Sequence, residues 1–146
     1  MKKMKTVIYC LALVAMAGFT SAAFAQEPTL TSAQVKFDTT RDDKKADTKL
    51  DVYLKTNDGH QVAKSEGNEG RWKNNSSHTT TLEVEGSRTK AEVENGSVSL
   101  TLHPNGDDKW EFNYRVTLKF SDGSLIRKHF TGCVLTQDSP TRTDVL

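Results

Sequence analysis

Apolar and polar residues alternate one for one along much of this chain. The pattern is most regular in WEFNYRVTLKF, residues 110–120, where every even-numbered residue is aromatic or aliphatic and every odd-numbered one is polar or charged. A strand places successive side chains on opposite faces of a sheet, so this pattern predicts a half-buried strand about 36 Å long. Shorter alternations predict further strands around residues 35–37, 50–54, 82–84 and 98–102.

Tight turns separate these segments. Four pairs of Asp or Asn followed by Gly tolerate the positive φ of such turns: Asp58-Gly59, Asn95-Gly96, Asn105-Gly106 and Asp122-Gly123. No segment after residue 25 has a sustained helical period. We therefore predict an all-β, antiparallel β-sandwich of about seven to eight strands, a single domain over residues 26–136. Residues 137–146 lack apolar alternation and are predicted to form a loose C-terminal tail.

The first 25 residues have a different composition. Three lysines precede an apolar run, VIYCLALVAMAGF, and small residues follow at Ala23 and Ala25. This order predicts a secretory signal peptide cut after Ala25 and, from its lysine-rich start, a bacterial protein that is periplasmic or secreted. A membrane anchor is the alternative, but the run is short for a bilayer span.

Charge and cysteine content limit the kinds of partner and disulfide that the mature chain can form. Without Lys2, Lys3 and Lys5 the remaining 121 residues carry 17 basic and 19 acidic side chains, a formal charge of −2. Such a balance does not indicate a nucleic-acid partner, which calls for a strongly basic face. Cys133 is the single cysteine left, and the simplest interpretation is a small core residue, with an intermolecular disulfide as the alternative.

An aspartate-rich loop is the first candidate site. Between two alternating segments lie Asp38, Asp42, Asp43 and Asp47, with Asp51 shortly after them. Calcium is held by six to eight oxygens from carboxylates and carbonyls, which such a loop can supply. The spacing excludes an EF-hand. Arg41, Lys44 and Lys45 interleave with the acids, so a charged turn that needs no metal is the alternative.

Two segments resemble the signatures of PLAT (lipoxygenase-homology) domains. ADTKLDVYLKTNDG, residues 46–59, is similar to the opening strand–loop signature, and LTLHPNGDDKWEFNYRVTL, residues 100–118, is similar to the second. They stand in the family's order and cover about a quarter of the mature chain. The resemblance implies an eight-stranded sandwich that binds membranes, lipids or protein partners rather than one that catalyses a reaction.

Carried over residue by residue, the resemblance implies calcium ligands at Asp43 (or Asp42) and Asp51. The chain departs from the pattern in three places. Asp47 stands where the family has Gly, Lys49 where it has Asp, and Pro104 where its His-Asp-Asn has Asp. Lys49 therefore places a cation where a ligand is expected, which Asp47 could offset.

A second candidate site is the polar segment SEGNEGRWKNNSSH around Trp72. An exposed tryptophan there could stack on a sugar or insert at a membrane interface, with Arg71 and Lys73 meeting phosphate headgroups. The alternative is a hydrophobic plug beneath a long loop.

No catalytic motif is present. The four histidines are scattered, and the chain contains neither a Gly-x-Ser-x-Gly nor a phosphate-binding Gly-Lys-Ser/Thr sequence. We therefore expect no enzyme and no catalytic residue. The favoured function is an exported, calcium-supported binding module for a lipid membrane or a protein partner. The alternative is a small exported inhibitor or envelope structural protein that acts through a loop tip or a strand edge.

Overall fold

A computed structural model describes residues 25–146, so the predicted signal peptide lies, but for Ala25, outside the described residues. Eight strands and one short helix follow in chain order: β1 (Leu30–Arg41), β2 (Lys49–Lys55), β3 (Gln61–Asn68), β4 (Ser77–Val84), α1 (Lys90–Glu94), β5 (Ser97–His103), β6 (Lys109–Phe120), β7 (Leu125–Thr136) and β8 (Thr141–Val145). The all-β prediction is confirmed. Within the described residues, no helix is long and apolar enough to cross a membrane.

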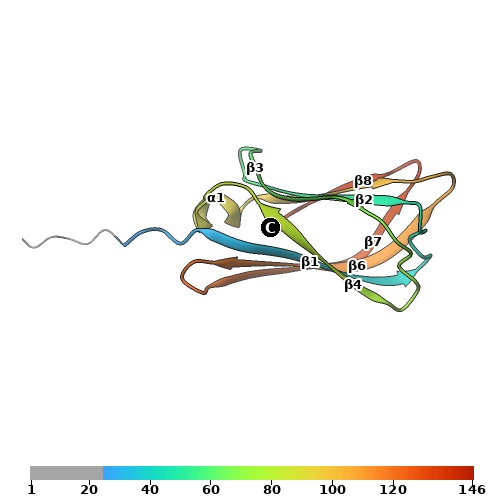
Figure 1. The fold of residues 1–146 in the computed structure, drawn as a ribbon, viewed down its shortest axis with the longest axis horizontal. Helices are drawn as coiled ribbons and strands as arrows, with labels where there is room; N and C mark the ends of the chain where they lie inside the picture. Colours follow the sequence, from blue (N-terminus) through green and yellow to red (C-terminus); the bar gives the residue numbers. More distant parts are fainter. Residues whose placement is uncertain (1–24) are drawn as a thin grey trace, which may run out of the picture.

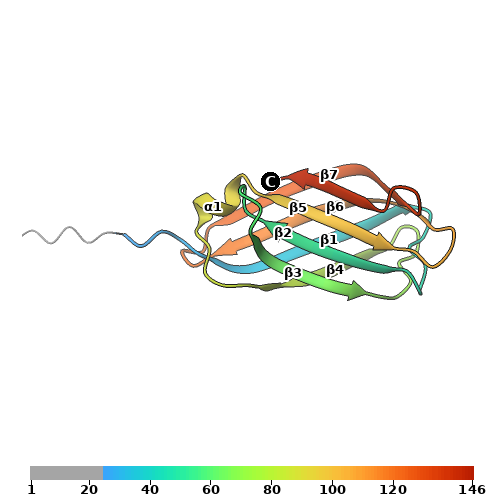
Figure 2. The ribbon, with the colours of Figure 1, turned by 90° about the horizontal axis from the view of Figure 1, so that it is seen from above.

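The strands form two layers that face each other (Figures 1 and 2). The ladder runs β7-β6-β1-β4-β3-β2-β5-β8, with antiparallel pairing throughout. Strands β7, β6, β1 and β4 make one layer, and β3, β2, β5 and β8 make the other. Two residue pairs, Ala63↔Val84 and Lys64↔Glu83, join β3 to β4 and so connect the layers on one side.

Strand β6 supplies the centre of the core. Its six even-numbered residues from Trp110 to Phe120 are each at most 1% exposed, while its odd-numbered residues lie on the outer face. Their rings pack on Phe37 of β1, with ring centroids 5.5 Å from Trp110 and 5.9 Å from Phe112. The strict alternation in the sequence therefore reflects a strand that is buried on one face along its whole length.

Strand β1 is longer than the sequence pattern predicts. It pairs with both β4 and β6, but register shifts between Leu30 and Ser32 and between Thr39 and Arg41 interrupt its period of two. Thr39 takes an inward position, and its Oγ1 accepts a hydrogen bond from Trp110 Nε1 at 3.1 Å. A polar residue in the core and two irregular positions conceal this strand from a hydropathy pattern.

The prediction of a loose C-terminal tail is wrong. Residues 141–145 form β8, which pairs with β5, and Leu146 is buried, with its N–H donated to Gly96 O at 2.9 Å. The inward positions of β8 carry a polar pair, Arg142 and Asp144, and Asp144 accepts a hydrogen bond from the buried Tyr114 hydroxyl at 2.5 Å. Because these inward residues are charged, the segment has no apolar alternation to detect.

Cys133 lies in β7 and is fully buried. Burial raises the pKa of its thiol, which disfavours the reactive thiolate. The structure agrees with the interpretation as a small core residue and leaves the sulfur inaccessible for a disulfide between chains.

Gly96 marks the close approach of the end of α1 to β2. A Cβ at this position would overlap the carbonyl oxygen of Lys55 and lie 3.0 Å from that of Val93. We expect Gly96→Ala to lower the free energy of unfolding by about 1–3 kcal/mol, because the backbone must shift to admit one methyl group. Ser97→Ala is the matched control and should change it by less than about 0.5 kcal/mol in urea titrations. Equal effects would contradict the packing described here.

Candidate functional site

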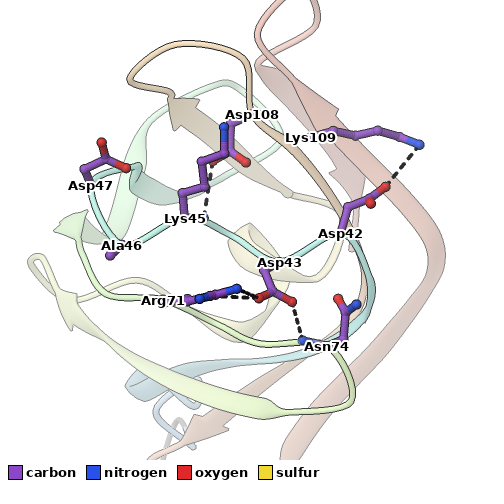
Figure 3. A pocket seen from close by; sticks show the side chains of 9 residues that line it. All are labelled: Asp42, Asp43, Lys45, Ala46, Asp47, Arg71, Asn74, Asp108 and Lys109. Atoms are coloured by element: carbon purple, nitrogen blue, oxygen red, sulfur yellow. Dashed lines mark hydrogen bonds and ion pairs between the residues drawn. The ribbon is translucent and has the colours of Figure 1, made fainter.

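Three loops meet at one end of the sandwich: the β1–β2 loop, the β3–β4 loop and the β5–β6 loop. They surround an open hollow of about 790 Å³ (Figure 3). Its lining combines acidic, basic and neutral side chains: Asp42, Asp43, Lys45, Ala46, Asp47, Arg71, Asn74, Asp108 and Lys109. This hollow contains three of the five aspartates predicted to bind metal.

Both carboxylate oxygens of Asp43 have partners within the protein. Arg71 Nε donates a hydrogen bond to its Oδ2 at 2.8 Å, Arg71 Nη2 forms an ion pair with the same oxygen at 2.7 Å, and Asn74 N–H donates to Oδ1 at 2.6 Å (Figure 3). These bonds to Asn74 and Arg71 hold the pKa of Asp43 below its usual range. Both carboxylate oxygens therefore face donors of the β3–β4 loop.

Asp38 and Asp42 have partners elsewhere. Asp38, on β1, accepts a hydrogen bond from Ser77 Oγ and lies 3.4 Å from Lys36 Nζ. Its pKa is lowered, first by the Ser77 hydrogen bond. Asp42 lies 3.3 Å from Lys109 Nζ, at the start of β6.

Asp47 and Asp51 are also paired separately. Asp47 accepts a hydrogen bond from Asn105 Nδ2 at 3.0 Å. Asp51, on β2, accepts one from Gly67 N–H at 2.7 Å, and its other oxygen lies 2.7 Å from His103 Nε2. The predicted Asn105-Gly106 turn thus contacts the aspartate-rich segment.

These five aspartates do not gather around one point. Across residues 25–146, no three Asp, Glu, His or Cys side chains form a group that could hold a metal ion. A calcium site needs six to eight oxygens at short range. The arrangement does not fit such a site, and the charged-turn alternative describes what each carboxylate does here. Calcium binding stays a prediction that the geometry does not support.

The sequence pattern missed the side chain at the centre of these loops, Lys44. It is fully buried, and its Nζ donates to Thr48 O at 2.5 Å, Gly70 O at 2.8 Å and Lys45 O at 3.4 Å. The ammonium also lies 4.8 Å from the centroid of the Trp72 ring, within the range of a cation–π contact. A lysine in a charged loop normally points to solvent, so sequence composition gave no signal for its burial.

Burial lowers the pKa of Lys44 to about 8, and the negative charges of Asp108, Glu69 and Asp47 partly oppose this shift. The ammonium is therefore mostly protonated at neutral pH. Its charge is compensated by carbonyl dipoles rather than by a direct salt bridge.

Asp108 anchors the same loop from the β5–β6 side. It is 5% exposed, and its Oδ2 accepts hydrogen bonds from Thr48 Oγ1 at 2.5 Å and from Lys45 N–H at 3.3 Å. Thr48 is itself buried. An aspartate in a turn after Asn-Gly reads as a surface residue, so its structural role is also invisible in the sequence.

Trp72 is 4% exposed, so the interpretation as an exposed, ligand-stacking aromatic is wrong, and the alternative of a plug under the loop agrees with the structure. Its backbone pairs with that of Lys44, with N···O distances of 3.0 and 3.2 Å, which turns the ring inward onto Phe37 at 5.3 Å. Arg71 is held by Asp43, and Lys73 is exposed on the loop. These three residues thus do not form one binding site.

A second candidate site lies on the outer face of the β7-β6-β1 layer. We define the basic face as Lys36, Arg115, Lys119, Arg127 and His129, all of them exposed. Their order follows from strand register: Lys36 pairs with Arg115 and Arg115 with His129, while Arg127 and Lys119 occupy the next two rows of β7 and β6.

No acidic residue stands in those three rows. The partners that complete them are neutral, namely Gln34 with Thr117, and Ser32 with Leu125. Among the described residues Arg115, Lys119 and Arg127 form no ion pair, and Lys36 alone is paired, with Asp38 at 3.4 Å. Like charges directly opposite each other destabilise a sheet, so the pair Lys36–Arg115 has an electrostatic cost that an anionic partner would relieve.

The opposite outer face differs. On β2 the outward residues Lys49, Asp51, Tyr53 and Lys55 include both signs of charge, and Lys49 lies 3.1 Å from Glu69. The chain as a whole is close to neutral, yet the two faces of the sandwich carry different charge. A single-sequence charge count averages over both faces, which is why the sequence did not reveal the basic face.

No protein-family model matches the chain, and no curated protein matches it. Among solved structures, the alpha toxin from Clostridium absonum is similar over 82% of this chain and 34% of the toxin, with 18% sequence identity and a TM-score of 0.47. The chain therefore spans about a third of the toxin's length. The resemblance to PLAT domains stays a prediction, and its expected all-β sandwich is what the structure contains.

Proposed function

We propose that this protein is an exported, non-enzymatic binding module that attaches to an anionic membrane surface through the basic face. The observation that carries the proposal is the segregation of charge: four permanent cations and a histidine on one layer, with no acid in their three rows. A lipid surface is a flat array of phosphates, so it can meet all of these side chains at once.

Strand geometry matches such a surface. Neighbouring strands lie about 4.8 Å apart and alternate residues about 7 Å apart, so the basic groups fall within a patch of roughly 10 by 14 Å. Each Lys or Arg near an anionic surface contributes about 1 kcal/mol, and the contribution decays within a Debye length of about 8 Å at physiological salt. Four residues acting together would give weak, reversible and salt-sensitive attachment.

An apolar side chain borders the basic face. Leu125 is 39% exposed and pairs with Lys119, whereas Val134, 42% exposed, pairs with Glu111 further along β7 and lies outside the basic face. An exposed apolar residue beside cations suits the boundary between headgroups and acyl chains. Leu125 therefore favours a lipid surface over a purely polar anionic polymer.

The test is cosedimentation of the mature chain with vesicles of phosphatidylcholine, with and without 30% phosphatidylglycerol. We expect binding to the anionic vesicles, lost at high salt. The double variant Arg115→Glu/Arg127→Glu should weaken binding by about 30-fold or more, since two contributions of about 1 kcal/mol are removed and then reversed.

Lys49→Glu/Lys55→Glu is the matched control, because it makes the same change in net charge on the opposite layer. It should bind the anionic vesicles as the unmodified chain does. If both double variants lost binding equally, net charge rather than the basic face would determine attachment. Lys73→Glu, on the exposed β3–β4 loop, tests in the same assay whether the loop tip rather than the basic face contacts the vesicles. The competing hypothesis is that the basic face binds an acidic protein partner. In that case the mature chain would bind vesicles of neither composition.

A further inference from the structure

We propose that the Lys44 ammonium is a built-in cation that takes the place of a metal ion at the loop end of the sandwich, so that the three loops are ordered without calcium. This inference is independent of membrane attachment. It rests on the surroundings of one nitrogen atom, Lys44 Nζ.

Three carbonyl oxygens from two loops surround that nitrogen. Lys45 O and Thr48 O belong to the β1–β2 loop, and Gly70 O belongs to the β3–β4 loop. An ammonium has three N–H donors and no acceptor, so three carbonyls satisfy it fully. Backbone carbonyls that converge in this way repel one another unless a cation lies between them, as they do around a calcium ion.

The third loop is tied to the same point through Asp108. Its carboxylate accepts hydrogen bonds from Thr48 Oγ1 and Lys45 N–H, and Thr48 and Lys45 are two of the three residues whose carbonyls accept from Lys44. Lys44 and Asp108 therefore both hold one short segment, residues 45–48. The cation and the anion are both buried and linked through this segment.

A diffusible divalent ion, the alternative source of charge, would find one buried carboxylate oxygen without a partner at this loop end, Asp108 Oδ1, but within residues 25–146 no group of three side chains that could hold a metal ion. Asp43 is occupied by Arg71 and Asn74, and Asp42 by Lys109. A calcium ion would have to displace these donors, and it would lie in the same loop end as the Lys44 ammonium, which repels it.

The mature chain is tested by thermal melts in millimolar calcium and in EDTA, and by amide hydrogen exchange. We expect the same Tm in both solutions. In Lys44→Met, which keeps the apolar stem and removes the ammonium, amides in residues 42–48 and 69–76 should exchange at least about tenfold faster. Lys45→Met, whose side chain is exposed, is the matched control and should leave exchange in 69–76 unchanged.

Two results would overturn the inference. One is a calcium-dependent rise in the Tm of the unmodified chain, which would mean that a metal site exists beside Lys44. The other is wild-type protection of both loops in Lys44→Met. The first measurement needs no variant, so it decides even if Lys44→Met does not fold.

Discussion

Phe112→Ala should lower the free energy of unfolding by about 3–5 kcal/mol, measured by urea denaturation. The side chain lies near the start of β6 and is fully buried, stacked on Trp110 at 3.8 Å between centroids and packed on Phe37. Removing the ring opens a cavity in a layer whose neighbours are themselves rigid aromatics, so the core cannot collapse to fill it.

Thr117→Val is the control on the opposite face of the same strand, and it should change stability by less than about 0.5 kcal/mol. Asn113 is less suitable although it also faces outward, because its Oδ1 accepts a hydrogen bond from Gly132 N–H at 2.8 Å, where the β6–β7 register shifts. If Phe112→Ala and Thr117→Val had similar effects, the assignment of inner and outer faces of β6 would be incorrect.

Deletion of residues 141–146 should destabilise the domain by more than about 3 kcal/mol or abolish cooperative unfolding. The deletion removes five residue pairs with β5 and the buried Leu146. It also removes Asp144, the acceptor of the Tyr114 hydroxyl, and an orphaned buried hydroxyl alone costs about 1–3 kcal/mol.

Val145→Thr controls for a change at the same strand that leaves the core intact, since Val145 is 70% exposed. It should melt at the wild-type temperature in circular dichroism scans. A truncated chain with the same Tm as the full chain would restore the prediction of a loose tail and contradict the pairing of β8.

The sequence predicted those strands whose burial is one-sided and purely apolar. In β6 and β5 each inward position is aromatic or aliphatic, so hydropathy and geometry coincide. Strand β8 was missed because its inward residues, Arg142 and Asp144, are charged and are satisfied by each other and by Tyr114. Only the fold brings that hydroxyl to them.

At the loop end, too, the contacts that matter form only in the folded chain and leave no local sequence pattern. The aspartate cluster was recognised, but its members turn to partners on the β3–β4 loop, the β5–β6 loop and strand β6, which no local pattern contains. In the charged-turn alternative, Lys44 is one of three basic residues that neutralise the neighbouring acids. Its burial depends on Gly70 and Trp72, residues of another loop, so it could not be predicted from the composition of its own segment.

The position of β1 in the ladder determines when the chain can fold. Its neighbour β6 lies far along the sequence, with Val35 paired to Val116, so the first layer cannot close until most of the chain is available. Pairings at such sequence separation fold slowly, on the scale of milliseconds to seconds. Until then β1 presents one row of unpaired backbone groups. Aggregation is thus a greater hazard for the nascent chain, before β6 joins, than for the finished sandwich.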